Sequence, residues 1–239
     1  MRVMGIDGCR AGWVATIRPL AGGDAERIVA HHLDALLGLP DLASIAIDMP
    51  IGLPEKIGPE GRGPEKALRP RLGARQSSVF SVPSRAAVYA EDYGQANRLS
   101  LMTSEPPRKI SKQCFFLFPK MREIDGLLRA KAAWAERVHE CHPEGAFMAM
   151  NGGQPLTHPK KVKGQVYRPG MEERVKLLTE RAAFTPDFLH SIPKGVGWDD
   201  CLDSAACAWS AARIARGEAM AFPENSVCDR YGLRMVIRV

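Results

Sequence analysis

The chain has 239 residues, of which 45% are hydrophobic and 25% are charged, and this is the composition of an ordinary globular protein. No apolar run reaches the roughly eighteen residues of a membrane span, and no signal peptide precedes residue 30, so we expect neither a membrane protein nor a secreted one. The six cysteines form no C-x-x-C pair and no zinc-finger cluster, which indicates reduced thiols in a cytoplasmic protein. The net charge of +6 suits a polyanionic partner without requiring one.

The first fifty residues consist of short apolar runs that predict β-strands, and the first two runs form a hairpin across the turn at 9–12. Prolines and glycines then dominate residues 50–83, which predicts a long irregular loop with at most one short helix. Helical patterning follows that loop. Strands are expected at 2–7, 13–17, 27–32, 44–48, 138–141 and 234–239, and helices at 34–37, 94–104, 111–131, 171–183 and 199–216.

Two aspartates end apolar strands. Asp7 closes the first strand in the segment G-I-D-G, and Asp48 closes the fourth in I-A-I-D-M-P. Open α/β sheets place their sites at the carboxyl ends of strands, where the strand ends meet at a crevice. Each aspartate taken alone is equally well explained as a turn former or a helix cap. The pair is therefore more informative than either residue.

A third acidic element begins the Ala-rich helix at 199–216, in the segment W-D-D-C-L-D-S-A. Asp199 fits a helix N-cap, and acids in a first turn are favoured by the helix dipole. Asp200 and Asp203 are three residues apart and share one helix face, where like charges repel each other unless a cation lies between them. Carboxylates without His or Cys ligands favour Mg²⁺ or Mn²⁺ over zinc. Two such ions about 4 Å apart are a known arrangement for phosphodiester hydrolysis.

Six short motifs follow one another in the chain: G-I-D-G-C-R-A-G-W, I-D-M-P-I-G-L-P, S-S-V-F-S-V-P-S-R, F-P-K-M-R-E-I-D, H-P-E-G-A-F and D-D-C-L-D-S-A. They resemble domain-of-unknown-function family 429, which is grouped with predicted nucleases of the RNase H-like superfamily and related to Holliday-junction resolvases. The resemblance spans residues 4 to about 217. It implies an RNase H-like α/β fold, with a five-stranded mixed sheet in the order 3-2-1-4-5 flanked by helices. The whole chain, 1–239, is then one domain with an irregular insertion at about 50–110.

The resemblance also implies the roles of the acids. Asp7 and Asp48, on adjacent strands, and Asp200 with Asp203, on the last helix, are the expected catalytic and metal-binding residues. Resolvases generally have glutamate at the position of Asp48, so Glu140 on the next strand is a substitute ligand. For Glu140 a structural role at a strand edge is about as well supported.

Other polar residues point to substrate binding. Basic clusters recur at 62–75, 109–122 and 160–168, and together they can offset several phosphates. The serines of S-S-V-F-S-V-P-S-R have no general base beside them, so we expect them to position a substrate and not to act as nucleophiles. His139 and His142 are three apart on an expected strand and point to opposite faces, which argues against a shared zinc ion. The expected substrate-binding residues are Arg10, Ser78, Arg85, Lys120, Arg122, Lys160 and Lys161.

These observations lead to a metal-dependent nuclease or related phosphodiesterase that uses Mg²⁺ or Mn²⁺, acts on nucleic acid and has no membrane partner. DNA, RNA and nucleotide substrates, and any oligomeric state, are compatible with the sequence. Two alternatives stay open. The protein can be a non-catalytic binding or regulatory protein of the same fold. It can also be a phosphotransferase of the actin and sugar-kinase type, although those proteins usually need two copies of the fold and this chain has no internal repeat.

Overall fold

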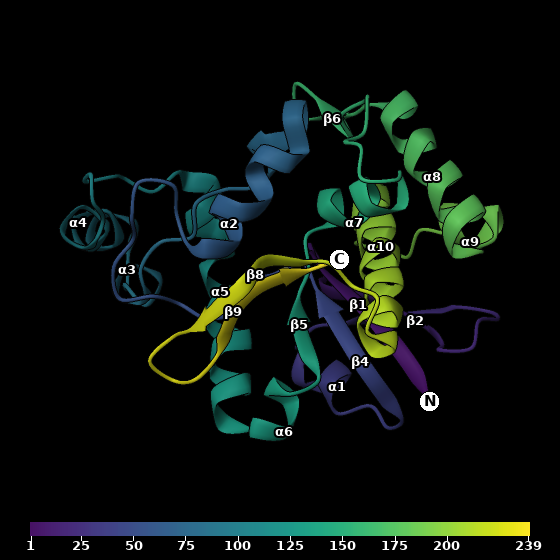
Figure 1. The fold of residues 1–239 in the computed structure, drawn as a ribbon, viewed down its shortest axis with the longest axis horizontal. Helices are drawn as coiled ribbons and strands as arrows, with labels where there is room; N and C mark the ends of the chain where they lie inside the picture. Colours follow the sequence, from purple (N-terminus) through teal and green to yellow (C-terminus); the bar gives the residue numbers. More distant parts are fainter.

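The computed structural model describes residues 1–239 as a mixed α/β fold in which helices cover both faces of a central sheet (Figure 1). The sheet has seven strands in the order β3-β2-β1-β4-β5-β9-β8. Its centre, β1-β4-β5-β9, is parallel, and β2, β3 and β8 pair antiparallel to their neighbours. The strands are β1 (Arg2–Cys9), β2 (Gly12–Pro19), β3 (Glu26–Ala30), β4 (Leu42–Ile47), β5 (Val138–Glu140), β8 (Ala221–Cys228) and β9 (Arg234–Arg238), with a separate small hairpin of β6 (Lys161–Val162) and β7 (Gln165–Val166).

The prediction of a five-stranded sheet is wrong, because the C-terminal hairpin β8–β9 adds two strands beside β5. The predicted neighbours β3-β2-β1-β4-β5 are present in that order. β9 matches the strand expected at 234–239, whereas β8 was not predicted. Its sequence A-F-P-E-N-S-V-C contains Pro223 and lacks a regular apolar alternation. Both features are tolerated in a strand at the edge of a sheet.

Two separate hydrophobic clusters lie on the two faces of the sheet. One contains side chains of α7, α8 and α10, and the other contains side chains of α1 and α5. None of the helices combines the length and the apolarity needed to cross a membrane. The helices are α1 (Asp34–Leu37), α2 (Gly63–Leu68), the 3₁₀ segment η1 (Arg69–Ser78), α3 (Arg85–Val88), α4 (Tyr93–Thr103), α5 (Lys112–Ala130), α6 (Ala132–Ala135), α7 (Pro143–Met150), α8 (Arg168–Ala182), α9 (Pro186–His190) and α10 (Trp198–Arg216).

The long helix α10 lies directly against β1. Successive side chains of a strand point to opposite faces, so Val3, Gly5 and Asp7 share the face on which α10 packs, while Met4 and Ile6 contribute to the other cluster. At Gly5 an added Cβ would lie 1.9 Å from the backbone nitrogen of Ala208. The missing side chain of Gly5 therefore allows α10 to approach the strand that carries Asp7.

The insertion predicted at about 50–110 lies between β4 and β5, and this part of the chain contains more helix than the sequence indicated. The segment 50–83, expected to be irregular, includes α2 and the 3₁₀ segment η1. Arg62, in this segment, has a fully buried side chain that donates hydrogen bonds to Glu65 Oε1 (2.7 Å) and Glu140 Oε1 (2.6 Å). Because Glu140 is on β5, this ion pair fastens the insertion to the sheet.

Replacing Arg62 with methionine should therefore be strongly destabilising. The substitution leaves Glu65 and Glu140 buried without a counter-charge, and we expect a loss of about 3–5 kcal/mol in the free energy of unfolding, measured by urea denaturation. Lys66→Met is the matched control, because Lys66 pairs with Glu60 at the surface (3.0 Å) and such pairs contribute less than about 1 kcal/mol. Equal losses in the two variants would contradict the anchoring role of Arg62.

Candidate metal centre

Three carboxylates from three separate elements meet at the carboxyl end of the central strands. In the parallel register of β1 and β4, Ile6 lies opposite Ile47, so Asp7 and Asp48 are the next residues on each strand. The amide of Asp48 donates to the carbonyl of Ile6 (2.9 Å), which extends the pairing by one residue. Asp203 comes from the second turn of α10. One carboxylate oxygen of each residue lies within 4.8 Å of the other two, so the three acids can hold a metal ion.

Burial makes this acidic cluster unfavourable in the absence of a cation. Burial, and then repulsion from Asp48 and Asp203, hold the pKa of Asp7 well above its ordinary value. Burial likewise raises the pKa of Asp48 to about 6, although the nearby Lys160 opposes the rise. The pKa of Asp203 is also raised by burial to about 6, again against the effect of Lys160. Each carboxyl therefore prefers to be protonated, or to have a positive charge beside it.

Lys160 supplies part of that positive charge. Its ammonium group donates to Asp203 Oδ2, and Asp203 and Asp7 raise the pKa of Lys160 although burial lowers it. The other oxygen of Asp203, Oδ1, is buried and has no hydrogen-bond partner. Three ionised carboxylates facing one ammonium group leave two uncompensated negative charges, which a divalent cation balances. The partnerless Oδ1 is an available ligand for such a cation.

A second layer of ion pairs surrounds the cluster. Glu144, at the start of α7, pairs with Arg174 of α8, and both side chains are buried. Asp199, on the first turn of α10, pairs with Lys161 (2.5 Å). The first pair joins α7 to α8, and the second joins β6 to the first turn of α10. Lys160 and Asp203 are close to the second pair in the chain.

A cavity of about 290 Å³ opens beside Asp48. Ser77, Ser78, His142 and Lys160 are among the residues that line it, together with Glu144. The imidazole of His142 faces the carbonyl of Ser78 through Nε2 (3.3 Å), while its Nδ1 is buried without a partner. A small polar substrate can therefore reach the acidic cluster through a cavity that offers hydroxyl groups, a cation and an imidazole.

Two of the acids expected at the site lie outside the cluster. Asp200 accepts a hydrogen bond from the backbone amide of Gly197 (3.0 Å) and so caps α10. Glu140 is bound by Arg62 and by the amide of Ile51 (2.8 Å). The hydrogen bonds of both carboxylates are local or structural, so the structure gives neither of them a place among the three clustered oxygens.

The residues expected to bind substrate also divide into two groups. Ser78 and Lys160 line the cavity beside Asp48, and Lys161 pairs with Asp199 nearby. Arg85, in contrast, is buried and donates to Asp125 (2.6 Å) and Asp229 (2.7 Å), which makes it a structural cation. Lys120 also lies near the cluster: it donates to the carbonyl of Gly12, its side chain passes Gly8, and Asp7 is among the acids that oppose the lowering of its pKa by burial. Arg122 donates to the carbonyl of Ala90 (3.2 Å), and Arg10 is exposed after β1.

Sequence reasoning did not identify the Glu144–Arg174 pair or the position of His142. The motif H-P-E-G supplied a signal for His142 and Glu144, because it follows β5 closely, at the edge of the sheet where β1 and β4 also end. Arg174 is far along the chain, within the helical pattern of α8, and no local feature of the sequence marks it.

The raised pKa values predict how stability depends on pH. A carboxyl whose pKa is higher in the folded protein than the ordinary 3.8 binds protons more tightly when folded, so its contribution to stability is lost as pH rises toward and through about 6. In EDTA, the free energy of unfolding of the wild type should therefore fall as the pH rises from 4.5 to 7.5. We expect this fall to exceed the fall in Asp48→Asn by on the order of 1 to 3 kcal/mol. Urea denaturation at both pH values measures this difference, and parallel pH profiles would contradict it.

Chemically, the site combines three oxygen ligands, a fixed ammonium group and an adjoining polar cavity. A family model described as "Protein of unknown function (DUF429)" matches residues 5–227, which include all three clustered acids. No curated protein and no solved structure matches the chain.

Proposed function

This chain belongs to the DUF429 family, whose description gives no function, and we propose from the geometry of its site that it is a metal-dependent phosphodiesterase acting on nucleic acid. In this proposal Asp7, Asp48 and Asp203 hold Mg²⁺ or Mn²⁺. Oxygen ligands without nitrogen or sulfur favour these hard cations.

One observation carries the proposal: three buried carboxylates on β1, after β4 and on α10 lie with their oxygens within 4.8 Å of one another. Oxygens bound to the same Mg²⁺ lie at most about 4.2 Å apart, which is twice the usual metal–oxygen distance, so small side-chain rotations bring the three oxygens to that spacing. When bound, such an ion lowers the pKa of a water molecule and polarises a phosphoryl oxygen.

The protein's own groups complete the site. Lys160, beside Asp203, can donate to an oxygen of the scissile phosphate and so offset its charge. Ser77, on the wall of the cavity, can donate a hydrogen bond to a neighbouring substrate oxygen, whereas the hydroxyl of Ser78 already donates to the carbonyl of Arg75 (2.8 Å). His142 also lines this cavity, so its imidazole would lie beside a bound substrate.

The topology supports the RNase H-like part of the proposal. The neighbours β3-β2-β1-β4-β5, with one acid at the end of β1, one after β4 and one on the last helix, form the arrangement that the resemblance to RNase H-like nucleases implies. The hairpin β8–β9 is an addition to that core.

The direct test is a panel of labelled substrates: single strands, duplexes, RNA–DNA hybrids, branched junctions and a small phosphodiester such as bis(4-nitrophenyl) phosphate. Each is incubated with the protein in Mg²⁺, Mn²⁺ or EDTA. We expect cleavage of at least one substrate with metal and none in EDTA. Metal binding without cleavage of any substrate would favour a non-catalytic binding protein.

A further inference from the structure

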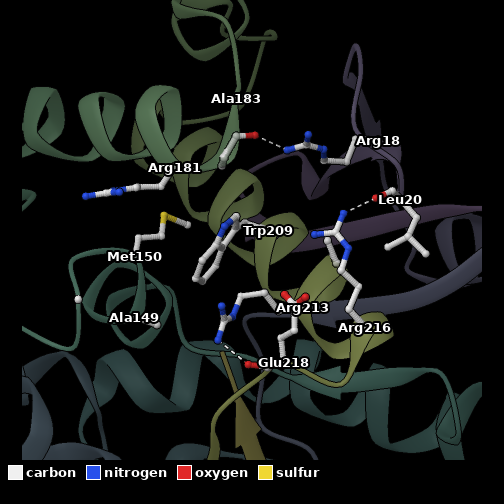
Figure 2. Close-up of a pocket in the computed structure, with 13 residues that line it drawn as sticks. Arg18, Leu20, Ala149, Met150, Arg181, Ala183, Trp209, Arg213, Arg216 and Glu218 are labelled. Carbon is white, nitrogen blue, oxygen red and sulfur yellow. Dashed lines mark hydrogen bonds between the residues drawn. The ribbon is translucent and has the colours of Figure 1, made fainter.

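A second cavity, of about 560 Å³, lies at the opposite end of α10 from the acidic cluster (Figure 2). Its walls come from β2, from the ends of α7 and α8, and from the last turns of α10. Four arginines line it, and the only carboxylate among the lining residues is that of Glu218. The arginines are Arg18, Arg181, Arg213 and Arg216.

Among the four buried arginines of this protein, Arg18 is the one that has no acidic partner. The three other buried arginines, Arg62, Arg85 and Arg174, each form ion pairs with buried carboxylates. Arg18, only 9% exposed, donates to the carbonyl of Ala182 and forms no ion pair. A buried charge without a counter-charge is costly, so an anion in this cavity would relieve an unfavourable arrangement.

The neighbouring arginines are also without acidic partners. Arg213 and Arg216 each donate to a backbone carbonyl, and Nε of Arg213 is buried with no partner. Arg216 is close enough to Arg18 that, together with burial, it lowers the pKa of Arg18. Arginines in the last turns of α8 and α10 are also favoured by the helix dipole. That explanation does not extend to Arg18, which is on strand β2.

The cavity also has an aromatic wall. Figure 2 shows the Trp209 indole in the middle of the cavity, with Arg18 and Arg216 on one side of it and Arg181 and Met150 on the other. The guanidinium of Arg213 lies 4.8 Å from the centroid of the Trp209 ring. An indole beside several guanidinium groups can bind a planar base and an anion at the same time, and a cavity of this volume accommodates a mononucleotide.

We propose that this cavity is a binding site for a nucleoside phosphate, with the phosphates held by Arg18 and Arg216 and the base packed against Trp209. The site is separate from the candidate metal centre. Arg18 pairs with Val3, four residues before Asp7 on β1, a distance of about 13 Å along the strand. Arg213 is ten residues after Asp203, about 15 Å along α10. The proposal therefore does not depend on the phosphodiesterase activity.

Isothermal titration calorimetry of the full chain in EDTA tests it, with ADP, pyrophosphate and adenosine as probes. EDTA keeps divalent metal from recruiting the phosphates to the acidic cluster. We expect ADP to bind, pyrophosphate to bind about 10-fold more weakly because it lacks the stacked base, and adenosine to bind more weakly still. If none of the probes binds, or if pyrophosphate binds as well as ADP, the nucleoside phosphate site is wrong.

Variants assign the binding to this cavity. Arg216 is exposed, so Arg216→Gln should keep the wild-type melting temperature while its ADP affinity falls more than 10-fold. Trp209→Leu should weaken ADP binding and leave pyrophosphate binding unchanged. Arg98→Gln, an exposed arginine on α4 without an ion pair, is the matched control and should bind ADP as the wild type does. Wild-type ADP affinity in Arg216→Gln would overturn the proposal.

Discussion

Asp7→Asn is expected to lose more than about 100-fold of the metal-dependent cleavage activity while keeping the wild-type fold. Even residues that only support a metal ligand typically change affinity or activity by 10- to 100-fold, and Asp7 offers an oxygen directly to the proposed ion. The substitution also removes a buried carboxyl whose pKa is raised by burial. In EDTA at pH 7.5 the melting temperature of Asp7→Asn should therefore equal or exceed that of the wild type.

Asp200→Asn is the matched control for this experiment. Asp200 is near Asp203 on the same helix, but its carboxylate accepts the Gly197 amide and lies outside the three clustered oxygens. The activity of Asp200→Asn should stay within about a factor of ten of the wild type, because the side-chain oxygen of asparagine can still accept the hydrogen bond from Gly197. Equal losses in the Asp7 and Asp200 variants would show that the site contains a different set of acids.

Gly5→Ala should be the most destabilising single-methyl substitution in the sheet. The new Cβ would lie 1.9 Å from Ala208 N and 2.2 Å from Ser204 O, and both are backbone atoms that cannot rotate away. Helix α10 must then move off β1, which also carries Asp203 away from Asp7. We expect a loss of more than about 3 kcal/mol in the free energy of unfolding, at or beyond the upper end of overpacking effects, measured by urea denaturation.

Gly126→Ala provides a control of opposite sign. Gly126 is exposed within α5, and an added Cβ there has nothing within 4 Å. Alanine is the better helix former by up to about 1 kcal/mol, so this variant should be more stable than the wild type. If the urea midpoint of unfolding of Gly5→Ala equalled that of the wild type, α10 would not pack on β1 as closely as described.

Local sequence patterns predicted the central strands well. The apolar runs that end at Asp7 and Asp48 correspond to β1 and β4, and the turn at 9–12 joins β1 to β2 as a hairpin. The edge strand β8 was missed because its residues are half exposed and interrupted by Pro223, so the pattern that marks a buried strand is absent. The 3₁₀ segment η1 was missed for a similar reason, since its Pro and Gly residues are those of an irregular loop.

The acidic cluster could be predicted in part. Strand ends placed Asp7 and Asp48 together, and helix periodicity offered Asp200 and Asp203 as equals. Packing separates the last two: Asp203 faces the sheet, whereas Asp200 turns back to cap its own helix. Which side of α10 meets β1 depends on the close approach at Gly5, and that is a tertiary contact.

Cations were harder to assign than acids. Arg85 and Lys160 were both expected to bind substrate, yet Arg85 neutralises buried Asp125 and Asp229 while Lys160 reaches Asp203. Nothing local distinguishes an arginine that pairs with a buried acid from one available to a phosphate. The partners come from distant parts of the chain, and only the folded structure identifies them.

The most direct test of the acidic cluster as a metal site is a calorimetric titration of the metal-free protein with Mn²⁺ at pH 7.5. The titration compares the wild type with Asp203→Asn and Asp200→Asn. Asp203 offers a buried oxygen without a hydrogen-bond partner, so its loss should weaken Mn²⁺ binding more than about 100-fold, whereas Asp200→Asn should bind nearly as the wild type does. Absence of Mn²⁺ binding in the wild type, or unchanged affinity in Asp203→Asn, would contradict the assignment of Asp7, Asp48 and Asp203 as metal ligands.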